Sequence, residues 1–329
     1  MSASSEAGQA SLVVLAVKIL QQGGLVAIPT ETVYGLAADA SNELAVRRIF
    51  AAKGRPSSHP LIVHLPSAEA ARDWALEIPP RASALMQTFW PGPLTLVLRR
   101  SARALDVVTA GQDSVALRVP AHPLALQILR EMGGGLAAPS ANRHGRVSPT
   151  TAEHVRADLG GAVDLVVDGG PCQVGVESTI VDARAHRLEI LRPGGVPRED
   201  LEAAIGEVIP VREQASVRVP GTLASHYAPR AGVVVVERPQ LRARAAEEVA
   251  RAGSGRVAVV SPSDQDAPAG ALHLPIPGDT AGFARELYAV LREADERGAA
   301  LVIVAPPRPG GLGLAVRDRL LRASAPRSG

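Results

Sequence analysis

Short apolar runs alternate with helical patterns along most of this chain, and this alternation restricts its fold more than any other feature. Helical spacing of apolar residues predicts helices over 11–22 and 43–52, and Thr150 with Glu153 forms a capping-box pattern that predicts a further helix start. Some predicted strands lie only a hairpin apart and others are separated by helices, which predicts a mixed sheet. The runs that predict strands are LVAI (25–28), LIVHL (61–65), LTLVL (94–98), VALRV (115–119), DLVVD (164–168), STIVDA (178–183) and RLEIL (187–191).

The pattern changes after about residue 207. The stretch up to residue 231 has scattered apolar residues, several prolines and no period, which indicates a linker. Beyond it, VVVV (233–236), RVAVV (256–260) and LVIVA (301–305) are each followed by a helical pattern. The fold class is therefore α/β: a twisted mixed sheet with helices over 1–207, a linker or lid over 208–231, and a smaller Rossmann-like parallel domain over 232–329.

Composition excludes several classes of protein. The chain has 35 Lys and Arg against 33 Asp and Glu, and its aromatic content is 2%. This balance disfavours an RNA-binding module, which would use basic and aromatic side chains. The N-terminus lacks the charged and apolar regions of a signal peptide, and no apolar run is long enough to cross a membrane. With Cys172 as the single cysteine, we expect a cytoplasmic protein that has no membrane partner.

Two polar segments follow the first strands and helices. Pro29–Gly35 is a polar loop directly after a buried strand, where α/β proteins commonly bind ligands, although its hydroxyls could equally cap a helix. Lys53 and Arg55 flank a glycine just before the next strand. Surface charges are the usual role of such residues, but a point charge beside a planar fork also suits phosphate oxygens. His59 and His64, in the same segment, are more typical of structural histidines.

Three later segments interrupt apolar runs with small or polar residues. Residues 137–142 (AAPSAN) carry Ser140 and Asn142, and Ser148 follows shortly afterwards; a plain loop and a ligand loop are both open interpretations. Glu177-Ser178-Thr179 precede an apolar run. Arg192 ends a predicted strand beside Pro193 and two glycines.

The order of these motifs resembles one family. PTETVYGL, KGRPSSHPLIVH, FWPGPLTLVL, VALRVPAHP, APSAN with SPT, GVESTIVD and LRPG together resemble the YrdC/YciO-type threonylcarbamoyl-AMP synthases over about residues 12–200. The stretch PGTLASHYAPRA and the tail ending GLGLAVRDRLLRAS resemble the long, two-domain members of that family.

The resemblance implies a reaction in which L-threonine, bicarbonate and ATP give threonylcarbamoyl-AMP and pyrophosphate, for modification of tRNA by a downstream transferase complex. It implies Mg²⁺ as cofactor, and tRNA or that complex as partners. By the same matching, catalysis falls to Lys53 and Arg55. The implied ATP contacts are Lys53, Arg55, His59, Ser114, Ser140, Asn142, Ser148 and Arg192. The implied L-threonine contacts are Thr32, His64, Arg118, the backbone at Ala138, and Ser178. The linker is polar between Pro220 and Pro229, and this predicts a lid in which His226 and Tyr227 reach the ligand.

These roles suit the side chains. Arg118 offers a fork for a carboxylate, and cations offset the repulsion between a carbamate and the α-phosphate. Three positions depart from the family pattern: His59 replaces an asparagine, Leu223–Ser225 replace a basic and aromatic linker stretch, and Asp318 replaces an asparagine.

Other enzyme classes lack their signatures here. There is no GxxxxGK[ST] phosphate loop and no GxSxG elbow, and the histidines and Cys172 show no metal-ligand spacing, so the metal ligands are unknown. Two alternatives stay open: a non-catalytic RNA-binding or ribosome-associated module, and a carbamoyl-adenylate-forming enzyme that uses carbamoyl phosphate.

Overall fold

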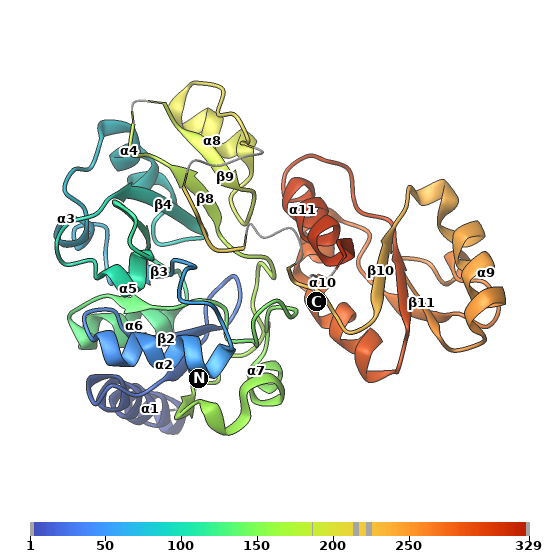
Figure 1. The fold of residues 1–329 in the computed structure, drawn as a ribbon, viewed down its shortest axis with the longest axis horizontal. Coiled ribbons are helices and arrows are strands. Elements are labelled where there is room, and N and C mark those ends of the chain that lie inside the picture. Colours follow the sequence, from blue (N-terminus) through green and yellow to red (C-terminus); the bar gives the residue numbers. More distant parts are fainter. Residues whose placement is uncertain (1–2, 186, 213–216, 222–225, 327–329) are drawn as a thin grey trace. The chain divides into compact units, whose positions relative to one another are not determined.

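A computed structural model describes residues 3–185, 187–212, 217–221 and 226–326. They form two compact units (Figure 1). The first comprises the described residues of 1–144, 149–173 and 177–221. The second comprises those of 145–148, 174–176 and 222–329. The first unit thus extends past residue 207, and the predicted boundaries of the linker stay predictions.

The first unit is built on a nine-stranded sheet in the order β7-β1-β2-β6-β3-β5-β4-β8-β9. Pairs β1·β7, β3·β5 and β4·β8 are parallel, while β1·β2, β2·β6, β3·β6, β4·β5 and β8·β9 are antiparallel. The predicted mixed sheet is therefore confirmed. The strands are β1 (Val26–Ile28), β2 (Gly35–Asp39), β3 (Ile62–His64), β4 (Leu94–Arg99), β5 (Ser114–Arg118), β6 (Leu136–Ala137), β7 (Leu165–Val166), β8 (Thr179–Asp182) and β9 (Glu189–Arg192).

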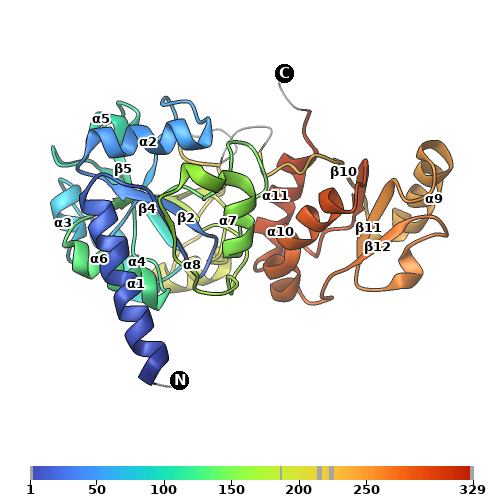
Figure 2. The same ribbon diagram turned by 90° about the horizontal axis from the view of Figure 1, so that it is seen from below.

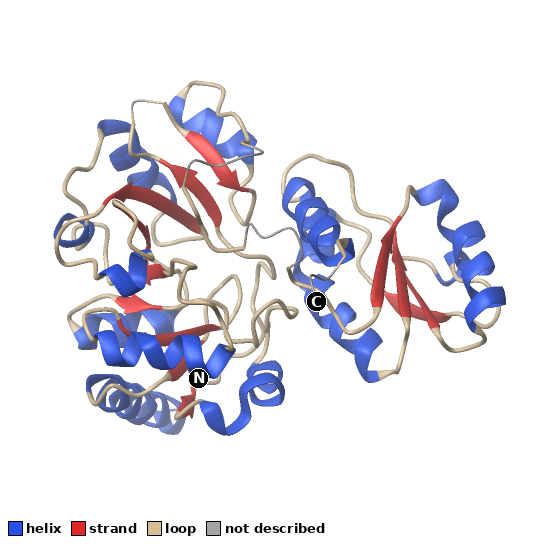
Figure 3. Cartoon of the chain, viewed as in Figure 1, coloured by secondary structure: helices blue, strands red, loops and turns tan. Residues whose placement is uncertain are grey.

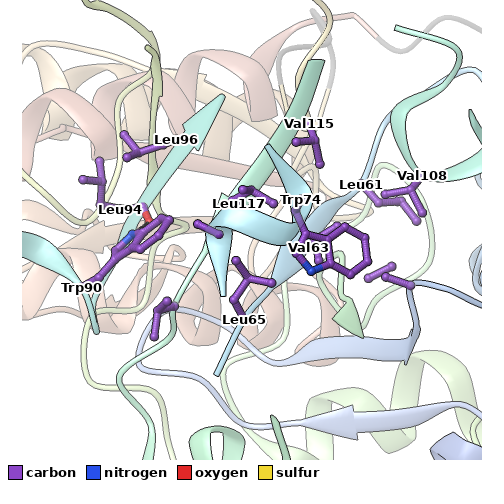
Figure 4. Packing of buried hydrophobic residues seen from close by; sticks show 14 of the residues in the cluster. Leu61, Val63, Leu65, Trp74, Trp90, Leu94, Leu96, Val108, Val115 and Leu117 are labelled. Carbon is purple, nitrogen blue, oxygen red and sulfur yellow. Dashed lines mark hydrogen bonds between the residues drawn. The ribbon is translucent and has the colours of Figure 1, made fainter. Parts of the chain in front are cut away.

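One face of this sheet is packed along its length against helices. Val63, Leu96 and Leu117 from three neighbouring strands enter one large core cluster with Trp74 and Leu85 (Figure 4). Because alternate residues of a strand point to opposite faces, their neighbours in sequence face the other way. The helices that contribute to this cluster are α2 (Glu43–Lys53), α3 (Ala71–Trp74), α4 (Pro80–Phe89), α5 (Asp106–Thr109), α7 (Ala152–Leu159) and α8 (Arg198–Ile205).

Two helices cover only part of the other face. Helices α1 (Ala3–Gln21) and α6 (Pro123–Met132) contact one another and bury Val26, Ile28 and Leu136 on the β1, β2 and β6 side (Figure 2). Over the other half of this face, a smaller cluster joins strand residues such as Ile62 to Val217 and Val219. Several buried polar side chains, among them His64 and Arg118, also lie on this half.

The second unit has a four-stranded parallel sheet in the order β10-β13-β11-β12, with helices on both faces (Figure 3). Helix α9 packs on β11 and β13, while α11 contacts β10 and α10. The predicted parallel α/β domain is confirmed. Its elements are β10 (Gly232–Val235), α9 (Leu241–Ala252), β11 (Val257–Ser261), β12 (Leu272–Pro275), α10 (Thr280–Glu296), β13 (Leu301–Val304) and α11 (Gly313–Ser324).

One local prediction was wrong. Helix α7 begins after Thr151, whose hydroxyl accepts a hydrogen bond from the His154 amide, so Thr150 is not the N-cap. The Thr150 amide instead donates to His154 Nδ1 at 3.3 Å. Within the described ranges, no helix combines the length and apolar character that crossing a bilayer requires.

Candidate active site

Lys53 is the last residue of α2, and its side chain points into the protein. Gly54 caps the helix in the left-handed conformation, with φ 61°, and turns the chain there. Lys53 is 3% exposed, and its ammonium donates to the carbonyl oxygens of Ser140 and Asn142, each at 2.5 Å. Burial, and then the nearby Arg55, lower the pKa of Lys53 well below its usual value, while two carbonyl acceptors favour the charged form. Lys53 therefore orders the predicted 137–142 loop.

Arg55 lies beside Lys53 and is also buried. Its Nη2 donates to the Pro60 carbonyl at 3.0 Å, which fixes the loop between α2 and β3. The rings of His59 and His144 lie 5.4 Å apart, and burial followed by the charge of Arg55 lowers the pKa of both imidazoles, that of His144 to about 4. The structure thus collects two cations and two neutral imidazoles around this turn, which suits an anionic ligand.

The loop that Lys53 holds also lies against the loop after β1. The Leu36 amide donates to Pro139 O at 2.7 Å, and the Ala141 amide donates to Tyr34 O at 2.8 Å. The Tyr34 hydroxyl in turn donates to Gly170 O at 2.8 Å. Two polar segments that are about 100 residues apart in sequence are therefore joined at one end of the sheet.

Arg118 is the last residue of β5, and its side chain connects the loop after β1 to the sheet. Its Nη1 donates to Thr32 Oγ1 at 2.9 Å, and its Nη2 donates to Glu31 Oε1 at 2.6 Å. Thr30 and Thr32 share a hydroxyl–hydroxyl hydrogen bond of 2.8 Å. All four side chains are buried. Thr32 and Arg118, predicted to bind the same ligand, are in direct contact.

His64 lies directly beside Arg118, because the two are paired residues of the parallel strands β3 and β5. Burial, and then the charge of Arg118, lower the pKa of His64 to about 3, so the imidazole is neutral near pH 7. Its Nδ1 is buried and has no hydrogen-bond partner among the described residues. An unsatisfied buried nitrogen costs stability unless a ligand pairs with it, so His64 is suited to contact a polar ligand.

The same face continues across β4 and β8. Thr95 and Ser178 share a hydroxyl–hydroxyl hydrogen bond of 2.7 Å. Arg192, at the end of β9, donates to Ser178 O at 2.7 Å and to Pro220 O at 3.0 Å. A Cβ at Gly194 would lie 2.3 Å from the Ser178 carbonyl carbon, so the close approach of this turn to Ser178 requires glycine.

The remaining predicted contacts occupy different places. Ser114 begins β5 and is buried on the same face as Arg118, since both have the same parity on that strand. The Ala138 amide donates a hydrogen bond to Ile62 O at 3.0 Å, so this N–H is not available to a ligand. Ser148 is buried and belongs to the 145–148 segment of the second unit.

His226 and Tyr227, the two residues predicted to act as a lid, are buried and belong to the second unit. Tyr227 has φ 60°, and its ring stacks on Tyr288 with centroids 5.9 Å apart. The guanidinium of Arg319 lies 5.0 Å from the centre of the Tyr227 ring, and the His226 ring lies 4.1 Å from it. Leu223–Ser225 lie outside the described residues. Asp318 accepts hydrogen bonds from Arg319 and Arg322, which gives this carboxylate a structural role.

Two residues of this site were missed in the sequence. Glu31 pairs with Arg118, although the sequence placed it only within a polar loop. Thr95 is the single hydroxyl in the apolar run LTLVL, and its alternation with Leu94 and Leu96 already placed it on the opposite face. A lone polar residue at one strand parity is the signal that could have identified it.

The described residues hold no group of three histidine, cysteine or acidic side chains that could bind a metal ion. The chain therefore does not supply the ligands of a dedicated cation site in this part.

The fold and these contacts define a two-domain α/β protein with a polar site on the open half of its larger sheet. Residues 18–194 match the family model Sua5_yciO_yrdC, described as "Telomere recombination", and residues 196–325 match that of the C-terminal domain of threonylcarbamoyl-AMP synthase. The chain is 42% identical to the threonylcarbamoyl-AMP synthase of Pyrococcus abyssi, over 94% of this chain and 93% of that one. It is 40% identical to the Bacillus subtilis synthase, over 95% and 92%.

A solved structure agrees. The crystal structure of P. abyssi Sua5 complexed with L-threonine matches with a TM-score of 0.89 at 40% identity, covering 95% of this chain and 94% of that one. The chain belongs to the Sua5/YciO/YrdC family, in its long form with two domains. It is an enzyme of the threonylcarbamoyl-AMP synthase type, a nucleotidyltransferase.

Proposed function

We propose that this chain condenses L-threonine, bicarbonate and MgATP to threonylcarbamoyl-AMP and pyrophosphate. One observation carries this: Lys53 holds the 140–142 loop, that loop pairs with the loop after β1, and Thr32 in the latter contacts Arg118. A series of short contacts within one unit thus links Lys53, a cation suited to phosphate, to Arg118, a cation suited to a carboxylate. The relatives' names and the threonine complex of P. abyssi Sua5 support L-threonine and ATP as substrates.

In this proposal the nucleotide lies on the Lys53 side of the site. Lys53 and Arg55 offset the charge of the phosphates, with Arg192 as a third cation on the same face. His59, Ser114, Ser140, Asn142 and Ser148 are proposed to orient the nucleotide by hydrogen bonds. Lys53 already orders the carbonyls at 140 and 142, so it would hold both the loop and the ligand.

The amino acid lies on the Arg118 side. Arg118 takes its carboxylate, while Thr32, His64, Ser178 and the backbone at Ala138 surround the rest of the molecule. The threonine amine attacks bicarbonate carbon and water leaves, which gives a carbamate. A carbamate oxygen then attacks the α-phosphorus of ATP, the bond to the β-phosphate breaks, and pyrophosphate leaves. No side-chain nucleophile is needed; the protein aligns the two anions and offsets their repulsion.

The adenylate product needs both protection and a recipient. It would be passed to a downstream transferase complex for tRNA modification, in the predicted cytoplasmic location. His226 and Tyr227, with the segment before them, are proposed to act as the lid that limits hydrolysis of the product.

The direct test is product analysis with the full chain. Pyrophosphate release should require both L-threonine and bicarbonate and should accompany a labile adenylate. Release of ADP and phosphate, or no dependence on threonine, would contradict the proposal. A reaction with carbamoyl phosphate in the absence of threonine would indicate the carbamoyl-adenylate alternative, and nucleotide-independent RNA binding would indicate the non-catalytic one.

A further inference from the structure

Glu31 carries a buried negative charge to which the proposed reaction gives no role. Its carboxylate lies at the tip of the loop after β1, and its side chain is 9% exposed. Oε1 accepts from Arg118 Nη2 at 2.6 Å, and Oε2 accepts from the backbone amide of Ala121 at 3.0 Å. Removing two charges from water costs several kcal/mol per ion in general, so a buried ion pair is weak evidence of a purely stabilising role.

The contacts of Arg118 define what it can still bind. A guanidinium has five N–H donors. The protein takes three of them: Nε donates to Gly92 O, Nη1 to Thr32 Oγ1, and Nη2 to Glu31 Oε1. One N–H remains on each terminal nitrogen, and no further acceptor for them lies among the described residues. One N–H on each terminal nitrogen is the number of donors that the two oxygens of one carboxylate can accept.

The charges of Glu31 and Arg118 offset one another near neutral pH. His64 beside Arg118 is neutral because burial lowers the pKa of its imidazole. Burial raises the pKa of the Cys172 thiol to about 12 and lowers the pKa of His122, so these two neighbours of Glu31 are neutral as well. Burial of these groups disfavours a ligand that leaves an uncompensated charge beside them.

We propose that Glu31 is a positioning residue that fixes the fork of Arg118 and offsets its charge, so that this site selects zwitterionic α-amino acids over carboxylic acids that lack the amine. A zwitterion brings no net charge, and its carboxylate can take the two remaining N–H donors of Arg118. Without Glu31, the charge of Arg118 would be uncompensated, and the site would accept a simple carboxylate more readily. The proposal rests on the proposed placement of L-threonine at Arg118.

The test uses the full chain and two ligands: L-threonine, and 3-hydroxybutanoate, which keeps the carboxylate and hydroxyl but lacks the amine. Calorimetry gives the affinity ratio of the two, and steady-state rates give KM and kcat. In Glu31→Gln we expect the KM for threonine to rise about 10- to 100-fold, with kcat and the KM for ATP within about 3-fold of wild type. The preference for threonine over 3-hydroxybutanoate should fall about 10-fold or more.

Glu31→Asp separates charge from position. Its carboxylate keeps the charge but is one methylene too short to reach both Arg118 and Ala121, so the KM for threonine should rise while the preference for the zwitterion is retained. Glu31→Asp also provides a test of the positioning role if Glu31→Gln does not fold. Glu43→Gln, which removes an exposed carboxylate on α2 paired with Arg47, is the matched control and should change neither quantity.

Three results would contradict different parts of this picture. An unchanged affinity ratio in Glu31→Gln would overturn the selectivity role, and an unchanged KM for threonine in a variant with a lowered melting temperature would reduce Glu31 to a structural residue. Wild-type protein that releases pyrophosphate without any dependence on threonine would overturn the proposed function itself.

Discussion

His64 and Arg118 are paired residues of two neighbouring parallel strands, and both point to the open half of the sheet. The next strand continues the row with Thr95, whose hydroxyl meets Ser178. Paired residues on adjacent strands share a face, so sheet register alone brings together side chains from residues 64, 95, 118 and 178. The rigidity of the sheet then fixes the spacing of these groups before a ligand arrives, which limits the entropy lost on binding.

Removal of either cation near the 140–142 loop should reduce turnover strongly. We expect Lys53→Ala and Arg55→Ala each to lose about 10²–10³ in rate, which corresponds to about 2.7–4 kcal/mol of transition-state stabilisation. Lys53 is buried and also orders the loop, so unfolding of each variant must be measured alongside activity. Arg47→Ala, on the exposed side of the same helix, is the control. A folded Lys53→Ala protein with wild-type turnover would exclude a role for Lys53 at the phosphates.

ATP affinity should depend on pH through Lys53. Burial and Arg55 lower its pKa in the free protein, whereas phosphate oxygens would favour the ammonium and raise it. Binding therefore takes up a proton, and the KM for ATP should rise as the pH rises through the lowered pKa. In Lys53→Arg, which stays protonated, this rise should disappear. An identical pH profile of the ATP KM in both proteins would show that Lys53 is charged throughout.

Acid should destabilise the protein partly through His64. Its pKa falls from 6.5 in the unfolded chain to about 3 in the fold, so between these values only the unfolded state takes up the proton. Stability is therefore complete above pH 6.5 and is lost as the pH falls toward 3, by about 3 kcal/mol at pH 4.5. His64→Gln should reduce the pH dependence of the free energy of unfolding by about that amount. If urea titrations give wild type and His64→Gln the same change in the free energy of unfolding between pH 7.5 and pH 4.5, another group is responsible.

The sequence predicted the strands and helices that carry long apolar patterns, and it failed where those patterns are short. β2 (Gly35–Asp39) consists largely of small residues, and β6 (Leu136–Ala137) has two residues, so neither has a recognisable period. Both are stabilised by pairing with strands distant in sequence, which no local pattern reveals. The polar motifs were found as separate segments of the sequence. The Glu31–Arg118 ion pair was not found, because it depends on a contact between residues 87 positions apart.

The first unit should need residues 217–221 for its stability. Val217 and Val219 complete the apolar cluster on the open half of the sheet, and Pro220 O accepts the hydrogen bond from Arg192. A chain that ends at residue 212 keeps Ile209 and the backbone bonds of 210–212 but loses these groups, so we expect it to be about 3–6 kcal/mol less stable in urea than a chain that ends at residue 221. The longer chain should bind ATP, yet it lacks His226 and Tyr227, so we expect it to make little stable product. Equal stability of the two chains would show that the 217–221 segment merely rests on the sheet, and full synthesis by the longer one would remove the proposed lid from the mechanism.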